Sequence, residues 1–155
     1  MEHNNVYFAS PWFTPEQEER EERLKAKLRS LGFDVWSPKE QAVVGTVSNW
    51  KTRQKIFDGN CDAIESSDIV FAVTDGKDMG TIWEAGFAYG INKLNEFVSA
   101  RKIVIVYYCE TLNGGKFNLM LAQSGNIVID KFEDLDMLPK LIEEQQEVFY
   151  NGLVE

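Results

Sequence analysis

Three carboxylates, Asp75, Asp78 and Glu84, lie close together in a polar turn with two glycines and in the helix expected to follow it. Tyr7 stands near the end of an apolar run that should form the first strand. In a parallel sheet, the turns that follow neighbouring strands meet at one crevice, where ligands bind. Clustered carboxylates raise one another's pKa, which is a common way of dividing the roles of nucleophile and acid. These four residues are therefore a candidate catalytic group.

A purely structural interpretation of the same carboxylates is also open. The run Thr81-Ile82-Trp83-Glu84 has the spacing of a capping box, in which Glu84 would only bind a backbone amide at the start of a helix. Asp75 and Asp78 suit a glycine-containing turn, because such side chains bind nearby backbone groups. The spacing of the carboxylates does not separate the two interpretations.

The sequence lacks three common motifs of small-molecule enzymes. It contains no G-x-G-x-x-G, no G-x-x-x-x-G-K-[ST] and no G-x-S-x-G. These absences argue against a dinucleotide site, a P-loop and an α/β-hydrolase site. The remaining carboxylate chemistry on a neutral or weakly charged substrate is glycosyl transfer, in which an acidic pair stabilises an oxocarbenium-like transition state.

The elements that must position these residues alternate between strand and helix. We expect strands at residues 6–8, 33–36, 68–73, 102–108 and 126–129, and helices at 15–31, 53–66, 81–92 and 135–150. Thr14 should cap the first helix, with Pro15 at its first position. Residues 39–50 show no clean period and are expected to form a loop near the site. The pattern predicts a single α/β domain over residues 1–155, with a three-layer, doubly wound parallel sheet of about five strands, Rossmann-like or flavodoxin-like.

Composition restricts the partners and the compartment. With 16 Lys and Arg against 25 Asp and Glu, the chain has a net charge of -9, which argues against nucleic-acid polymers as partners. No apolar run has the roughly 20 residues of a membrane span, and the first residues lack the features of a signal peptide, so we expect a cytoplasmic protein without membrane contact. Cys61 and Cys109 show no metal-site spacing, and the chain has one His, so we expect two buried free thiols.

Four segments of the chain resemble the nucleoside 2-deoxyribosyltransferase family. The most specific is D-x-G-x-x-x-E-x-G-x-A, at residues 78–88, and a late Asn-Leu-Met triplet, at residues 118–120, favours transferases that act on free nucleosides. The other two are Val6-Tyr7-Phe8-Ala9-Ser10-Pro11-Trp12-Phe13 and Ile64-Glu65-Ser66-Ser67-Asp68-Ile69-Val70. Together the segments span most of the chain.

The resemblance implies roles for individual residues. Glu84 matches the family nucleophile, Tyr7 the tyrosine that orients it, and Asp78 the aspartate beside the substrate. Asn118 and Met120 match residues that reach into the active site of a neighbouring subunit. The resemblance therefore implies a homo-oligomer, often a hexamer built from dimers. An ordinary loop asparagine and a core methionine are the structural alternatives for the last two residues.

One position departs from the family pattern. Asn60 stands where the family usually has a second aspartate, with Asp58 and Asp62 on either side. An asparagine can hydrogen-bond a nucleobase but cannot deliver a proton to it. The proton donor for the leaving base is therefore open among Asp78, Asp62 and water.

Further residues are candidates for substrate binding. Gln41, Trp12 and Phe13 are candidates for the base pocket, the aromatic pair by stacking, although a core role for the pair is equally open. Asp75 and Gly80 lie in the turn beside the carboxylates. Whether purines or pyrimidines are accepted depends on the segment at residues 39–50.

The expected reaction exchanges the base of a 2'-deoxynucleoside for a free nucleobase, in nucleotide salvage. Glu84 would attack C1' and hold the sugar until a second base displaces it, without a metal or organic cofactor. One alternative is a deoxynucleoside 5'-monophosphate N-glycosidase, for which Ser10, Ser66 and Ser67 could supply phosphate donors but no basic partner is obvious. A non-catalytic nucleotide-sensing domain is the other.

Overall fold

The computed structural model describes residues 4–41, 49–98, 102–112 and 114–155. In these residues five parallel strands form one sheet in the order β2-β1-β3-β4-β5. The strands are β1 (Asn5–Ala9), β2 (Asp34–Trp36), β3 (Ile69–Val73), β4 (Val104–Tyr108) and β5 (Ile127–Ile129). The predicted doubly wound parallel sheet is thus confirmed, and its strand order changes direction between β1 and β3, where such sheets bind ligands.

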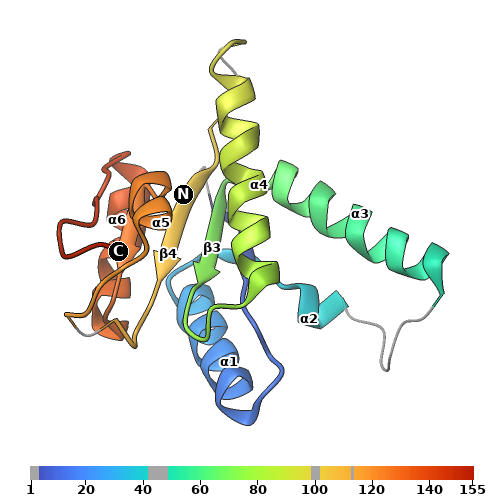
Figure 1. Cartoon of the computed structure of the whole chain (residues 1–155), viewed down its shortest axis with the longest axis horizontal. Helices are drawn as coiled ribbons and strands as arrows, with labels where there is room; N and C mark the ends of the chain where they lie inside the picture. The colour runs from blue at the N-terminus through green and yellow to red at the C-terminus, as the bar shows by residue number, and fades with distance from the viewer. Residues whose placement is uncertain (1–3, 42–48, 99–101, 113) are drawn as a thin grey trace.

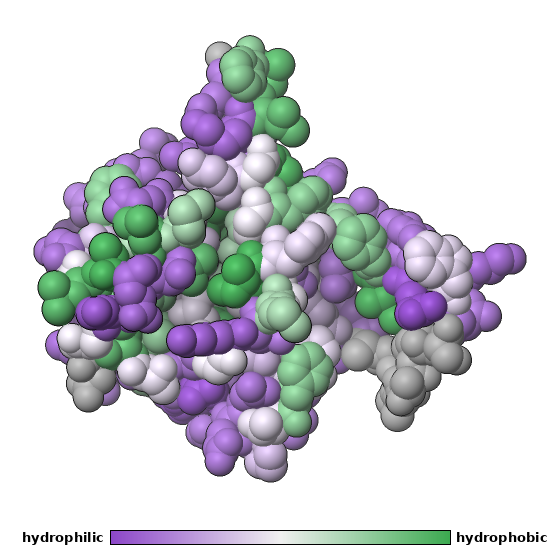
Figure 2. Space-filling view, in the orientation of Figure 1, coloured by the Kyte–Doolittle hydropathy of each residue, from purple (hydrophilic) through white to green (hydrophobic). Residues whose placement is uncertain are grey.

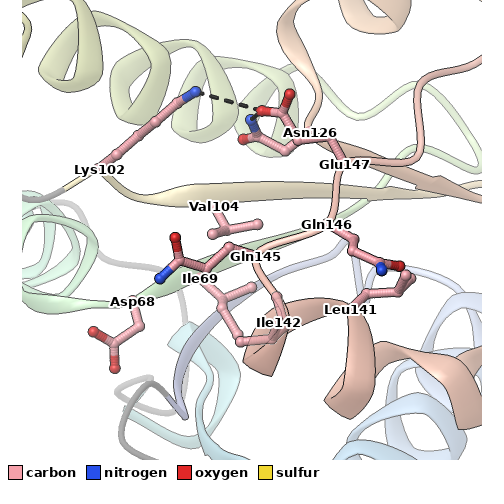
Figure 3. A pocket seen from close by; sticks show the side chains of 10 residues that line it. All are labelled: Asp68, Ile69, Lys102, Val104, Asn126, Leu141, Ile142, Gln145, Gln146 and Glu147. Atoms are coloured by element: carbon pink, nitrogen blue, oxygen red, sulfur yellow. Dashed lines mark hydrogen bonds and ion pairs between the residues drawn. The ribbon is translucent and has the colours of Figure 1, made fainter.

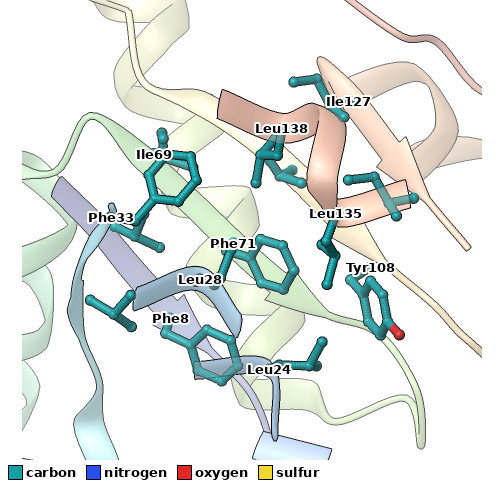
Figure 4. Packing of buried hydrophobic residues seen from close by; sticks show 14 of the residues in the cluster. Phe8, Leu24, Leu28, Phe33, Ile69, Phe71, Tyr108, Ile127, Leu135 and Leu138 are labelled. Carbon is teal, nitrogen blue, oxygen red and sulfur yellow. The ribbon is translucent and has the colours of Figure 1, made fainter. Parts of the chain in front are cut away.

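Helices cover both faces of the sheet and complete three layers (Figure 1). One face carries α1 (Pro15–Ser30), the 3-10 helix η1 (Phe132–Met137) and α6 (Leu138–Glu143), and Figure 4 shows its core around Phe8 and Phe71. The other face carries α3 (Trp50–Ser66), α4 (Met79–Asn95) and α5 (Leu119–Ser124). Because side chains alternate along a strand, Phe8 enters the first core and Tyr7 the second.

The starts of the helices agree only in part with those predicted from the sequence. Thr14 caps α1 through the amide of Gln17, and Pro15 is the first helical residue, as predicted. However, α3 begins at Trp50 with Asn49 as its cap, three residues before the predicted start. Part of the expected loop at residues 39–50 is also helical, as α2 (Pro38–Gln41), while residues 42–48 lie outside the described residues.

The predicted long helix at residues 135–150 is wrong. Helix α6 ends at Glu143, because Gln145 adopts a left-handed conformation with φ of 52° and the amide of Gln146 binds back to Leu141 O at 2.8 Å. The chain then returns to the sheet, where Val148 pairs with β5 at Ile127. Pairing with the sheet supplies backbone hydrogen bonds that helical periodicity does not reveal.

Within the part of the chain that the structure describes, no helix is long and apolar enough to cross a membrane.

Candidate active site

Tyr7 and Glu84 form a direct pair between β1 and α4. The Tyr7 hydroxyl donates to Glu84 Oε1 at 2.5 Å. The Tyr7 side chain is fully buried and stacks on Trp36 of β2, with 5.2 Å between the ring centroids. Glu84 is partly buried and forms no ion pair with any of the described residues. The structure therefore brings together two of the residues that the sequence predicted to share a site.

The capping interpretation of Glu84 is wrong. Helix α4 begins at Met79, and its cap is Asp78, whose Oδ2 accepts from the Thr81 amide at 2.8 Å and from Thr81 Oγ1 at 3.0 Å. Glu84 therefore lies in the second turn, too far along the helix to bind its first amides. Both Asp and Thr are good caps, so the sequence did not distinguish a start at Met79 from one after Thr81.

The surroundings raise the pKa of Glu84 to about 7. Burial is the main cause and the nearby charge of Asp78 adds to it, whereas the hydrogen bond from Tyr7 acts in the opposite direction. Burial and the charge of Glu84 raise the pKa of Tyr7 far above its usual value, so that this hydroxyl remains a proton donor to the carboxylate. The pair thus presents a carboxylate that is protonated and deprotonated near neutral pH.

Cys61 of α3 completes the surroundings of this pair. Its charged form interacts with both Tyr7 and Glu84, and burial together with nearby carboxylates raises the pKa of the thiol. The thiol is half-buried, not fully buried as expected, whereas Cys109 is buried, and both are free. Neither Cys61 nor Trp36 was selected from the sequence, because their proximity to Tyr7 depends on how α3 and β2 pack beside β1.

Asp75 is bound within the fold, and its role in substrate binding stays a prediction. Its carboxylate is buried and accepts from the amides of Glu110 at 3.1 Å and Thr111 at 2.8 Å. Asp75 therefore fixes the chain that leaves β4. The turn interpretation correctly predicted that the Asp75 carboxylate binds backbone amides. These amides belong to a distant segment, however, and not to the turn itself.

Asp78 and Gly80 lie at the start of α4, where the charge of Asp78 acts on Glu84. The Asp78 cap uses Oδ2, and Oδ1 has no hydrogen-bond partner among the residues that the structure describes. Gly80 is exposed, and a Cβ at this position would lie 3.1 Å from Asp78 Oδ2. A glycine here thus leaves room for the Asp78 carboxylate.

A cavity of about 420 Å³ borders Tyr7 on the side of β2 and α3. Gln41 and Asp62 line it together with Trp36, so the structure places the predicted base-pocket glutamine and one candidate proton donor beside Tyr7. Asn60 lies one residue before Cys61 on α3 and is half-buried.

The aromatic pair after β1 does not belong to the core as a unit. Phe13 is 71% exposed and packs against the half-buried Trp12, with 5.3 Å between the ring centroids. A core role for Phe13 is therefore wrong. Contact of either ring with a nucleobase stays a prediction.

Asn118 and Met120 line a second cavity, of about 480 Å³, at the carboxyl ends of β3 and β4. Asn118 caps α5 through the amides of Met120 and Leu121. Met120 is 74% exposed, so the alternative of a core methionine is wrong. Lys77 and Lys116 line the same cavity, and they supply basic groups that the sequence did not reveal.

A third cavity, of about 350 Å³, lies near the amino ends of β3 and β4, beside α6 (Figure 3). Lys102 pairs with Glu147 at 3.6 Å, and Asn126 donates to Glu147 at 2.7 Å. The cavity is lined by these polar groups and by apolar side chains, among them Ile69, Val104 and Ile142, and it lies at the amino ends of the strands. We therefore place the candidate site at the carboxyl ends of the strands.

Comparisons with known proteins identify the family and the fold. A family model described as nucleoside 2-deoxyribosyltransferase matches residues 6–136. Two solved structures show a similar fold. One is a 2-deoxyribosyltransferase from Bacillus psychrosaccharolyticus, with a TM-score of 0.77, 24% identity, and coverage of 94% of this chain and 98% of that one. The other, a conserved protein from Enterococcus faecalis V583, has a TM-score of 0.56, 23% identity, and coverage of 99% and 91%. No curated protein matches the sequence.

Proposed function

Because the chain belongs to the nucleoside 2-deoxyribosyltransferase family, we propose that it exchanges the nucleobase of 2'-deoxynucleosides through a sugar held covalently on Glu84. The observation that carries this proposal is the Tyr7–Glu84 pair, a partly buried carboxylate with a hydroxyl donor and no cation among the described residues. A cation would neutralise the carboxylate and weaken it as a nucleophile. Here the hydroxyl orients the carboxylate and leaves its charge available.

In the first step a Glu84 oxygen attacks C1', and the bond between C1' and the base nitrogen breaks. The electron pair leaves with the base, which takes up a proton. In the second step a nitrogen of the incoming base attacks C1' and gives up its proton, and the bond from C1' to Glu84 breaks to restore the carboxylate. Two inversions give net retention at C1'. No metal or organic cofactor takes part in either step.

Asp78 and the residues around Tyr7 have supporting roles in this proposal. Asp78 Oδ1 has no hydrogen-bond donor among the described residues and accepts a hydroxyl of the sugar. Gln41 binds the base in the cavity beside Tyr7, which Asp62 also lines. Asn60 binds the base without delivering a proton, so Asp62, Asp78 or water must supply it.

We further propose that a neighbouring copy supplies Asn118 and Met120 to this site, in a hexamer built from dimers. The strong exposure of Met120 supports this arrangement, because α5 presents that side chain away from its own core. The proposed enzyme acts in nucleotide salvage in the cytoplasm.

One observation favours a second candidate, hydrolysis of deoxynucleoside 5'-monophosphates. Lys77 and Lys116 line the cavity that holds Asn118, where they could bind a phosphate. The serine hydroxyls considered from the sequence do not favour it, because Ser10, Ser66 and Ser67 donate to backbone carbonyls.

The proposal is tested by assaying thymidine or deoxyinosine with a panel of free bases, beside a deoxynucleoside monophosphate alone. We expect base exchange with the nucleosides. Mass spectrometry after incubation with a slow 2-fluoro-deoxynucleoside should show a sugar adduct on the peptide that contains Glu84. If only the monophosphate is turned over, the second candidate is favoured over base exchange. If neither substrate is turned over and no adduct forms, a sensing domain is favoured.

A further inference from the structure

A group of charged side chains joins α1 to α2 near the cavity that borders Tyr7. We call it the α1–α2 charge network, and its members are Glu18, Glu21, Glu22, Lys25 and Arg29 on α1 and Lys39 and Glu40 on α2. Figure 2 shows mostly hydrophilic side chains at the lower end of the molecule, where α1 lies. Two members of the network, Glu21 and Lys25, are nevertheless fully buried. Glutamate and lysine are rarely buried unless they are paired.

The centre of the network is the buried ammonium group of Lys25. It lies 3.3 Å from a Glu21 oxygen, 3.0 Å from Glu22 and 3.1 Å from Glu40. Removing such charges from water costs about as much free energy as their attraction returns, so apolar side chains would stabilise the fold equally well. What paired charges add is a defined register between the elements that carry them. The network therefore indicates that the place of α2 along α1 matters.

The charges of the two helices specify how they align. In the network the acidic members on α1 precede the basic ones, and on α2 the basic Lys39 precedes the acidic Glu40. Lys39 meets the acidic part, at 3.0 Å from Glu18, and Glu40 meets the basic part, at 2.7 Å from Arg29. A shift of α2 towards the start of α1 would bring Glu40 next to carboxylates, and like charges repel. One register is thus favoured over its neighbours.

Helix α2 depends on these contacts for its position. It has four residues, of which Pro38 is the buried one. Helices this short are not stable by themselves and rely on tertiary packing. Apart from Pro38, α2 is held by the network and by the preceding Ser37, whose hydroxyl donates to Glu21 at 2.9 Å. The place of α2 is therefore set by α1.

The segment that is fastened in this way has both of its ends at the cavity beside Tyr7. Trp36, which stacks on Tyr7, precedes the segment, and Gln41 ends it. Both side chains line the cavity. Glu40 lines it as well, but its carboxylate binds Arg29 through both oxygens, at 3.0 and 2.7 Å. The exposed amide of Gln41 is therefore the group of α2 that can bind a ligand there.

We propose that the α1–α2 charge network is a positioning device for the nucleobase, because it sets where the Gln41 amide stands in this cavity. The inference rests on the proposed function, in which Gln41 binds the base. Lys25 and Arg29 are not among the described residues that line the cavity, so they act on the base through Glu40 and the backbone of α2. A change in either one weakens binding of the base and leaves the chemistry at Glu84 intact.

Steady-state kinetics of base exchange test this role with Arg29→Met, which keeps an unbranched apolar stem and removes the charge. We expect the KM for the incoming base to rise about 5-fold, as for one weakened hydrogen bond, and kcat to stay within about 2-fold. A rise in KM alone is the mark of lost binding. Arg29→Lys keeps the charge and should restore the KM. The matched control is Lys27→Met, which breaks the ion pair of α1 with Asp136 and should change neither constant.

Gln41→Ala tests whether the network acts through the amide. Alone, it should raise the KM for the base by a similar factor. Combined with Arg29→Met, it should add nothing further, because residues that act through one contact have non-additive effects. Additive increases in KM, or a loss in kcat as large as the rise in KM, would overturn the positioning role.

Hydrogen exchange of backbone amides reports the position of α2 without turnover. The peptide that contains residues 37–41 should exchange faster in Arg29→Met and in Lys25→Met than in the unmodified chain, and Lys27→Met should leave its exchange unchanged. Lys25→Met removes a buried partner of carboxylates, so circular dichroism is needed to show that it folds. Arg29 is 43% exposed, and Arg29→Met therefore decides the test if Lys25→Met does not fold. Unchanged exchange in Arg29→Met would overturn the inference.

Calorimetric titration separates this inference from the proposed reaction. The ligand is the free base that is exchanged fastest, or adenine if none is exchanged. We expect Arg29→Met to bind it about 5-fold more weakly than the unmodified chain does. If this difference is found without base exchange, the proposed reaction fails and the positioning of the base stands. If base exchange proceeds and the two proteins bind the base equally, the reaction stands and the positioning fails.

Discussion

Two glutamates on opposite faces of the sheet accept a hydrogen bond from a tyrosine, yet they differ sharply in charge behaviour. Tyr7 donates to Glu84 at 2.5 Å, and Tyr108 donates to Glu110 at 2.9 Å. Burial raises the pKa of Glu84 to about 7. Burial would also raise the pKa of Glu110, but Arg20 and Arg23, together with Tyr108, lower it to about 2.

The difference shows what a tyrosine alone does for a buried carboxylate. Arg20 and Arg23 bind Glu110 at 2.7 and 2.8 Å, and they satisfy its charge within the fold. Among the described residues Glu84 has a single hydrogen-bond donor, Tyr7, which fixes the direction of the carboxylate but leaves it free to bond to an electron-poor carbon. A carboxylate paired with arginines therefore stabilises the fold, whereas one bound only by a tyrosine hydroxyl is available for chemistry.

The two sites should differ most in the rate of base exchange after each carboxylate is removed in turn. Glu84→Ala should lower base exchange by about 10⁴-fold or more, because no other described group replaces the nucleophile. Glu110→Ala should keep the rate within about 10-fold, since the change lies on the opposite face of the sheet. Steady-state kinetics with thymidine and a purine base measure both, and equal losses would remove the distinction between the two sites.

Stability should respond to pH with opposite signs in the two pairs. The raised pKa of Glu84 means that its burial costs stability once pH rises above the unfolded value, 4.5, and fully so above about 7. Glu84→Gln should therefore stabilise the protein at pH 8, by at most about 3 kcal/mol, and make no difference at pH 4. Chemical denaturation at both values measures this.

The lowered pKa of Glu110 has the opposite consequence. Its ion pairs contribute stability above the unfolded value of 4.5, and this contribution is lost as pH falls to about 2. Allowing for partial exposure, Glu110→Gln should destabilise by about 2 kcal/mol at pH 7. A variant that is equally destabilised at pH 7 and pH 2 would show that charge is not the cause.

The smallest effects come from the two hydroxyls. The hydrogen bond from Tyr7 lowers the pKa of Glu84, so Tyr7→Phe should move the rising limb of the pH–rate profile to higher pH and lower the rate at neutral pH by about 10-fold. Tyr108→Phe should leave the profile unchanged and cost about 1 kcal/mol of stability. A Tyr7→Phe profile with an unmoved limb would mean that the hydroxyl does not act on Glu84.

The sequence predicted the sheet and the shared location of Tyr7 and Glu84 for one physical reason, whereas their direct contact was implied by the family resemblance. Long apolar runs identify buried parallel strands, and their carboxyl ends must converge. It failed where the partner of a polar group lies far along the chain. The carboxylate of Asp75 binds amides of the segment after β4, and Val148 leaves the expected helix to pair with β5. Neither partner has a local signal in the sequence.

The pairing of Val148 has a consequence for the behaviour of the protein in concentrated solution. Its amide donates to Asn126 O at 2.8 Å, and its carbonyl accepts from the Val128 amide at 3.1 Å. Unpaired backbone groups at the outer strand of a sheet are a template on which foreign strands can be added. By occupying the border of β5 itself, the chain hinders edge-to-edge aggregation.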